Sequence, residues 1–325
     1  MTHEWLIVET LCADKRTVIA DGGKIKDWAN IARARAYGAA ASARMVALVD
    51  ACVASGSEQR ELLTLRNSQV VETRAVPVVA AFDVVNAVHL WIGPCDVVPP
   101  ARRSVAAWHF DVDEELNYQG QGDASVEAIL RVPEDQRRTV RAAQDNFQNI
   151  MRFDDRIGYV EIVSNIELGK SWQGSIVMSA FDGRLHHLQM VARADPHARV
   201  ARGLFHDISD VSPPEPVVDN AALRLLAASS GQGTGAIDLN TAVIYDWFSK
   251  PAPPLDQWQY TSPEIEPTDH ALLAAACKRL ESSSERESLT IRVRFDDTDW
   301  ITTDVLITAI NKDRAPQGLI QVTPR

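Results

Sequence analysis

The chain has 325 residues, of which 46% are hydrophobic and 24% are charged, an ordinary balance for a globular protein. This length exceeds what one hydrophobic core usually supports and predicts two or three domains. The formal net charge of −11 argues against a nucleic-acid partner, because binding to phosphates depends on lysine and arginine. No apolar run approaches the roughly 20 residues of a membrane helix, and Glu4 and Glu9 lie where a signal peptide would be basic and then apolar. We therefore expect a cytoplasmic protein without a membrane partner.

Residues 1–98 predict an N-terminal domain of two strands, a helical middle and about three further strands. An alanine-rich stretch has apolar residues from Trp28 to Cys52 at helical spacing, and Gly38 is expected to divide it. Prolines from Pro94 to Pro100 mark a linker, because proline continues neither a helix nor a central strand. The predicted strands occupy residues 4–11, 17–20, 70–76, 78–82 and 88–93.

Residues 103–212 repeat that order and predict a second domain with a five-stranded antiparallel sheet and helices on one face. Asp182-Gly183 predicts a two-residue hairpin turn between strands at 175–180 and 185–192, because such turns need positive φ. Residues 152–173 are an extra segment before this strand pair. Prolines from Pro213 to Pro216 mark a second linker.

Residues 218–325 predict a third domain with a short leading helix at 220–229. A glycine-rich run at 231–235 precedes a strand and lacks the Lys-Ser/Thr pair of a phosphate loop, so we expect a flexible lead-in. A helix is predicted at 267–281. The predicted strands lie around Ile237, at 243–245, 289–293, 301–310 and 319–322.

The second and third domains share two landmarks. Pro133-Glu134-Asp135 corresponds to Pro267-Thr268-Asp269, and the run from Gly203 to Ser209 corresponds to the run from Gly318 to Thr323. These motifs resemble those of PAS domains, which commonly place Pro-x-Asp at the start of the last helix and end on a Gly-x-x-x-Asp-Ile-Thr-like strand. The resemblance implies that Asp135 caps a helix that continues through Ala143. The third domain is a weaker copy, because its last strand lacks the aspartate.

The first domain has the same outline without these motifs, which makes it GAF-like or PAS-like in topology. The whole chain resembles the three-module GAF/PAS-type sensory proteins of mycobacteria and related actinobacteria, in which an opening like Trp5-Leu6-x-x-Glu9-Thr10-Leu11 precedes two PAS-like units. The resemblance implies an α+β fold of three small antiparallel-sheet-plus-helix domains. It also implies sensing or regulation, and it names no ligand.

Few residues suggest chemistry, and each has a structural alternative. His186-His187 and His109 lie on predicted strands, where a PAS histidine can ligate haem, but adjacent strand residues face opposite sides and a core role is the expected one. Carboxylate clusters at 111–115 and 296–299 would suit Mg²⁺ or Ca²⁺, yet both lack the pattern of a calcium loop and are expected to form turns. We expect no catalytic residue, no metal site and no cofactor.

The four cysteines lie far apart, without metal-binding spacing, and are expected to be reduced thiols. Most tryptophans lie in predicted strands, where core packing and an apolar ligand pocket are both open readings. The dense arginines between Arg102 and Arg141 are expected on a solvated helix face.

The expected function is a non-enzymatic sensory or regulatory protein that binds a small apolar ligand, a protein partner, or both. Self-association as a homodimer through a sheet face and flanking helices is also expected from the PAS resemblance. Two alternatives remain open: an interaction scaffold whose domain interiors are filled with side chains, and an unrecognised enzyme in a cleft between domains.

Overall fold

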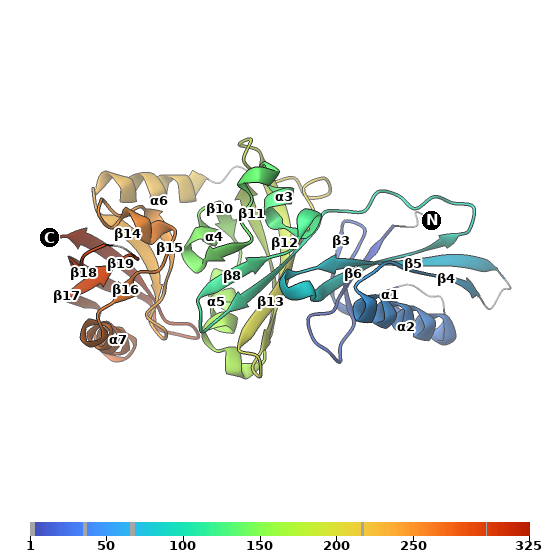
Figure 1. Ribbon diagram of the computed structural model, residues 1–325, viewed down its shortest axis with the longest axis horizontal. Coiled ribbons are helices and arrows are strands. Elements are labelled where there is room, and N and C mark those ends of the chain that lie inside the picture. Colours follow the sequence, from blue (N-terminus) through green and yellow to red (C-terminus); the bar gives the residue numbers. More distant parts are fainter. Residues whose placement is uncertain (1–3, 35–37, 66–68, 216–217, 297) are drawn as a thin grey trace.

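The computed structural model describes residues 4–34, 38–65, 69–215, 218–296 and 298–325. They form three antiparallel sheets in a row along the long axis of the molecule (Figure 1). We call residues 1–98, 103–212 and 218–325 modules 1, 2 and 3. The expected three-sheet α+β architecture is confirmed, with module 2 between the other two. Within the described ranges no helix is long and apolar enough to cross a membrane.

Module 1 is a six-stranded sheet with one long helix on one face. In spatial order its strands are β3 (Lys24–Asn30), β2 (Thr17–Asp21), β1 (Leu6–Glu9), β6 (Val85–Pro94), β5 (Val70–Val79) and β4 (Gln59–Thr64). Its helices are α1 (Ile31–Ala34), α2 (Ala39–Ser55) and the short η1 (Ala81–Asp83). Helix α2 buries Met45, Leu48, Val49 and Cys52 against the sheet at helical spacing. It ends at Gly56, which has a φ of 61° and donates its N–H to the carbonyl of Cys52.

Two expectations for module 1 need correction. Trp28 belongs to strand β3 and not to the helix, and the Arg193 guanidinium lies 4.0 Å from the centre of its ring. The runs at 70–76 and 78–82 are largely one strand, β5, which continues through Pro77. Because β4 pairs with β5 only as far as Ala75, Pro77 lies where β5 has a single neighbour and a missing N–H is tolerated.

Module 2 has seven strands and not five, because two short strands extend its edges. Their spatial order is β10 (Ile150–Phe153), β11 (Ser171–Ser179), β12 (Leu185–Asp195), β13 (Val200–Asp207), β7 (Val105–Asp111), β8 (Leu116–Gln119) and β9 (Val140–Ala142). Its helices are η2 (Gly122–Ala124), α3 (Val126–Ile129), η3 (Glu134–Gln136), α4 (Ala143–Phe147), α5 (Arg156–Ser164) and η4 (Ile166–Leu168). The extra segment at 152–173 is thus mainly helical.

The expected helix start at Pro133-Glu134-Asp135 is wrong. These residues open only the three-residue η3, Asp135 accepts no capping hydrogen bond, and the chain then forms β9. An aspartate does cap the longer helix α5 of this module: the Oδ1 of Asp155 accepts from the Gly158 N–H at 3.1 Å. The continuous helix expected through Ala143 is interrupted by β9, which pairs with β8.

The turn between β11 and β12 is longer than expected. Ser179 pairs with Leu185, and the Ala180 N–H donates to the Arg184 carbonyl at 2.7 Å, so the connection has five residues. Gly183 does have the positive φ that the sequence predicts, at 80°.

Module 3 is a six-stranded sheet between two helices. Its strands, in spatial order, are β15 (Ile244–Ser249), β14 (Gly233–Asp238), β19 (Gln317–Pro324), β18 (Ile301–Asn311), β17 (Arg286–Arg294) and β16 (Glu264–Ile265). Its helices are α6 (Val218–Ser229), η5 (Asp256–Gln259) and α7 (Pro267–Ser282). The helix predicted at 267–281 is confirmed, but Glu266 caps it, whereas Asp269 binds the Arg292 backbone and guanidinium. The expected lead-in at 231–235 is already strand from Gly233.

All three sheets share one strand order. In each, the first strand lies beside the last, and five strands follow the same plan: β2-β1-β6-β5-β4, β8-β7-β13-β12-β11 and β15-β14-β19-β18-β17. One supersecondary unit is therefore used three times, and β3, β9, β10 and β16 are additions at the edges.

The sheets of modules 1 and 2 pack face to face. Along β12, Leu188 and Met190 point into module 2, whereas Val191 packs with Ile7 and Ala87 of module 1. The next residue on the same side, Arg193, donates to the buried carboxylate of Glu9 at 2.9 Å. The burial of nearly every residue in β12 follows from this arrangement, because both faces of the strand are covered.

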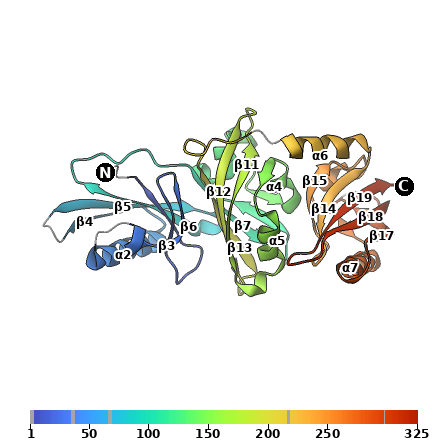
Figure 2. The same ribbon diagram turned by 180° about the vertical axis from the view of Figure 1, so that it is seen from behind.

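The other face of module 2 carries α4 and α5, and module 3 packs on these helices (Figure 2). Ala236, Tyr245 and Ala315 of module 3 belong to the hydrophobic core of module 2. Two ion pairs cross the junction: Arg156 with Asp246 at 3.0 Å and Arg314 with Glu161 at 2.8 Å. The helices of module 2 thus lie between two sheets.

Candidate functional site

A cavity of about 250 Å³ lies at the junction of modules 2 and 3. Module 2 contributes residues from β7, β8, α4 and α5, and module 3 contributes β14, β15 and the turn between them. The lining residues are Phe110, Val112, Glu115, Asn117, Ala143, Phe147, Tyr159, Val160, Val163, Ser164, Arg199, Asp238, Thr241, Val243 and Tyr245. Any occupant would therefore touch both modules, and we call this space the junction cavity.

Aromatic rings form much of the wall. Phe147 on α4 meets Tyr245 on β15 edge-on, with ring centres 5.4 Å apart, and lies 6.2 Å from the ring of Tyr159 on α5. Phe110 completes the set from β7. Apolar cavities of about 150 Å³ take up benzene, so the junction cavity has space for an aromatic ring with a short chain.

Asp238 supplies a buried carboxyl group to the cavity. It ends β14, is 4% exposed, and accepts hydrogen bonds from the Asn240 N–H at 2.9 Å, the Thr241 hydroxyl at 3.1 Å and the Ser164 hydroxyl of module 2. Burial raises its pKa, and these hydrogen bonds oppose the shift. Asp238 therefore both fixes the β14–β15 turn and joins the modules.

Glu115 supplies a second carboxyl group from the β7–β8 turn. Its Oε2 accepts from the Ser262 hydroxyl of module 3 at 3.3 Å. Burial raises its pKa, partly offset by this hydrogen bond and by nearby His270. Arg199, which also lines the cavity, is bound through its Nε to both carboxylate oxygens of Asp113, at 2.9 and 3.0 Å.

Tyr159 lines this cavity, and its hydroxyl group has no hydrogen bond to any described residue. Its ring packs among aromatic neighbours on α4, β10 and β11, and the residue is only 8% exposed. Burial raises the pKa of the phenol, so the group stays neutral and is able to donate or accept one hydrogen bond. By contrast, the Tyr245 hydroxyl already donates to Gln317.

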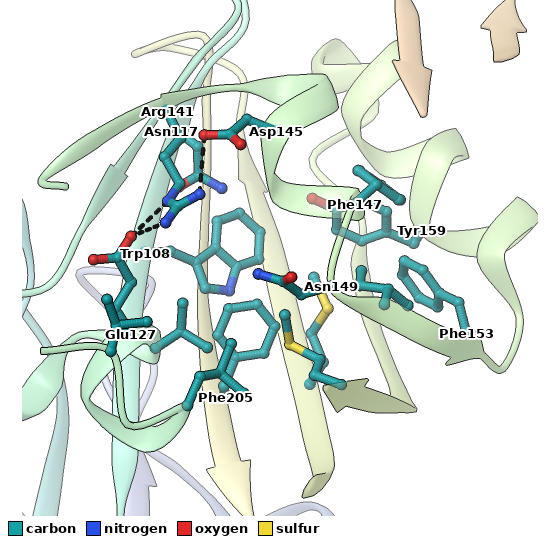
Figure 3. Close-up of a pocket in the computed structure, with 16 residues that line it drawn as sticks. Trp108, Asn117, Glu127, Arg141, Asp145, Phe147, Asn149, Phe153, Tyr159 and Phe205 are labelled. Carbon is teal, nitrogen blue, oxygen red and sulfur yellow. Dashed lines mark hydrogen bonds and ion pairs between the residues drawn. The ribbon is translucent and has the colours of Figure 1, made fainter. Parts of the chain in front are cut away.

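Behind Tyr159, Phe147 and Asn117 lies a smaller chamber of about 40 Å³ inside module 2 (Figure 3). Figure 3 shows Arg141 between Glu127 and Asp145 at one side of this chamber, with Trp108 and Phe205 below. The Arg141 Nε donates to Glu127 at 2.7 Å and its Nη1 to Asp145 at 2.9 Å. This volume holds no more than one or two water molecules, so the interior of module 2 is nearly filled.

Comparisons with known proteins agree with the fold. Residues 4–101 match the family described as Rv3651-like, N-terminal. A crystal structure of an uncharacterised protein from Mycobacterium tuberculosis aligns with a TM-score of 0.76 at 20% identity, over 99% of this chain and 96% of that chain. At this identity the likeness shows a shared fold, which extends across all three modules. It supports the expected likeness to a mycobacterial protein.

Two further solved structures match with low scores. An RNA-binding light-oxygen-voltage receptor covers 68% of this chain and 95% of its own, at 8% identity and a TM-score of 0.28. A methyl-accepting chemotaxis protein X covers 69% and 75%, at 9% identity and a TM-score of 0.23. Scores this low do not show that these proteins share a fold with this chain. No curated protein matches it.

The histidines singled out from the sequence do not line the junction cavity. The Nδ1 of His186 is 2.9 Å from Asp207, and that of His187 is 2.9 Å from the Ser212 carbonyl. Both side chains are buried, against the expectation that only one would be, because the segment after β13 covers the second. His109 packs its ring with Phe82.

The carboxylate clusters form turns, as expected. Asp111 Oδ1 accepts from the N–H groups of Asp113 and Glu114, and Thr298 accepts from the Phe295 N–H. Asp297 lies outside the described residues. In the described parts of the chain no three histidine, cysteine or acidic side chains are grouped as metal ligands would be.

Other expectations are met in part. Cys52 and Cys277 are buried thiols, whereas Cys95 is exposed. The dense arginines are not on a helix face: Arg141 lies on β9 in the ion pairs described above. Trp91 and Trp108 are fully buried, as expected for core packing.

Sequence reasoning did not identify Tyr159, Glu115 and Tyr245 as neighbours. The one available signal was the repeat itself, which aligns Asp238 with Asp111. Both aspartates end the first strand of their modules and accept hydrogen bonds from the following turn.

Proposed function

We propose that this chain is a sensory or regulatory protein of three tandem PAS-like modules, the first GAF-like or PAS-like. It binds a small, mainly apolar ligand in the junction cavity and acts without catalysis, through association with a protein partner or a second copy of itself. The observation that carries the proposal is the position of the cavity, because its walls come from both module 2 and module 3.

The position matters because a ligand shifts a conformational equilibrium only if it binds the states unequally. An occupant that touches α5 and the β14–β15 turn at once favours the arrangement in which both are close. The same arrangement is held by the Arg156–Asp246 pair and by the Ser164–Asp238 hydrogen bond. Ligand binding would therefore set the angle between modules 2 and 3.

The PAS assignment is supported by the strand order that the three sheets share and by the closing strand β13, which contains Gly203 and ends at Asp207. Association was expected through the exposed sheet face of module 2 or module 3. The sheet face of module 2 is covered by module 1, so a partner would bind module 3, where Ile310 on β18 is 65% exposed.

Native mass spectrometry of the purified full chain, with propylbenzene as an added probe, tests the ligand site. We expect a retained small molecule or uptake of one propylbenzene, accompanied by a change in the distance between labels on modules 2 and 3. Val163→Phe places a ring in the cavity and should abolish uptake, whereas Val98→Phe, at an exposed linker position, should not. If the wild-type chain neither retains a small molecule nor takes up propylbenzene, or if both variants take up propylbenzene equally, the scaffold with filled interiors would be favoured.

An enzyme in this cleft is the second candidate, and one observation favours it. Glu115 and Asp238 bring two carboxyl groups with raised pKa values into one cavity, a pattern found at sites of proton transfer. Turnover of a bound metabolite by the purified chain, lost in Glu115→Gln, would establish this function in place of the sensor.

A further inference from the structure

The junction cavity has an electrostatic asymmetry that bears on what it binds. The carboxyl groups of Glu115 and Asp238 both line it, and neither forms an ion pair with any described residue. The cation among its described lining residues, Arg199, is bound by Asp113, and its side chain is 51% exposed. The positive charge of Arg199 therefore lies at the rim of the cavity, and the two carboxyl groups lie in its interior.

A carboxylate without a counter-ion in a largely apolar cavity is costly even when it is hydrogen-bonded, and a cation placed beside it reduces that cost. The rings of Phe110, Tyr159 and Tyr245 add to the preference, because the face of an aromatic ring attracts a cation. The unbonded Tyr159 hydroxyl is also available to accept a hydrogen bond from an ammonium group. An anionic ligand would meet like charge from both carboxylates.

We infer that the ligand of the junction cavity is a small organic cation: an amine on an aromatic or apolar body of on the order of ten non-hydrogen atoms, the size that the cavity volume admits. The ammonium group lies between Glu115 and Asp238, and the apolar body packs among the rings. This inference rests on the proposed ligand site and adds its charge selectivity.

The test compares probes of nearly equal size on the full chain by calorimetry: phenethylamine, 2-phenylethanol and phenylacetate. We expect phenethylamine to bind about ten-fold or more tightly than the neutral alcohol, and phenylacetate to bind most weakly. Phenylacetate binding as tightly as the amine, or an alcohol that matches it, would overturn the inference. Binding of the alcohol alone would leave the ligand site intact and remove only its selectivity for cations.

Two variants locate the charge. Glu115→Gln keeps the shape of the side chain. It should lower the affinity for phenethylamine about ten-fold and leave the affinity for 2-phenylethanol unchanged. Glu134→Gln removes one negative charge from an exposed position on η3 and should change neither affinity. Circular dichroism of both variants checks that they fold. An amine affinity equal in wild type and Glu115→Gln would place the cation elsewhere and refute the assignment.

Discussion

Acid should weaken the junction between modules 1 and 2, because two histidines are buried there without charge. His206 is fully buried, with its Nδ1 3.0 Å from Gln189, which in turn donates to the Ile19 carbonyl of module 1. His89 is 5% exposed, and neither of its ring nitrogens has a hydrogen-bond partner among the described residues. Burial lowers the pKa of His206 to about 4 and that of His89 to about 3.

The sign of the effect follows from these shifts. A histidine with an ordinary pKa of 6.5 in the unfolded chain binds a proton more readily there than in the fold. The stability that neutral His206 contributes is therefore complete above pH 6.5 and is lost as the pH falls from 6.5 toward about 4. A pH of 5 is about 1.5 units below the pKa of a histidine in the unfolded chain, so each of the two histidines lowers the free energy of unfolding by about 2 kcal/mol at that pH.

Urea unfolding of the full chain at pH 8 and pH 5, followed by tryptophan fluorescence, measures this loss. His206→Asn keeps an amide that can bind Gln189 and should lose about 2 kcal/mol less than wild type between the two pH values. His197→Asn, at an exposed position, should behave as wild type. The carboxyl groups titrate alike in wild type and in both variants, so comparing the three proteins removes the contribution of these groups to the pH dependence of stability. If His206→Asn has the pH dependence of wild type, His206 is not held neutral and the reasoning fails.

Two further predictions concern stability. Asp155→Ala should lower the free energy of unfolding by about 2 kcal/mol, because Asp155 caps α5 and also accepts from the Trp172 indole N–H at 3.0 Å. Asp135→Ala should change the free energy of unfolding by less than about 0.5 kcal/mol, because Asp135 caps no helix. Urea titrations of both variants measure these changes, and a large loss of stability in Asp135→Ala would restore its capping role. A fragment of residues 103–212 should aggregate or unfold without cooperativity, because it exposes the apolar sheet face that module 1 covers, whereas residues 1–212 should unfold cooperatively. Circular dichroism and light scattering decide, and a monomeric, cooperative 103–212 fragment would show that this interface contributes little.

The local elements could be predicted from the sequence because their signals are local. The spacing of Met45, Leu48 and Cys52 specifies one face of α2, and Pro267 after Glu266 marks the start of α7. The repeated order of strands and helices was also visible, since it depends only on the succession of such elements. The common strand order of the three sheets follows from that repetition.

Contacts between modules decided the rest. Val191 lies in the strand predicted at 185–192, but only the packing of module 1 makes its side of the strand, which continues to Arg193, a buried interface. The junction cavity joins Glu115 to Asp238, which are far apart in the chain, through the position of α5 between two sheets. A sequence pattern specifies which face of an element is apolar, but the partner that covers the face is chosen by shape and charge over long separations, and so the candidate site became visible only in the tertiary structure.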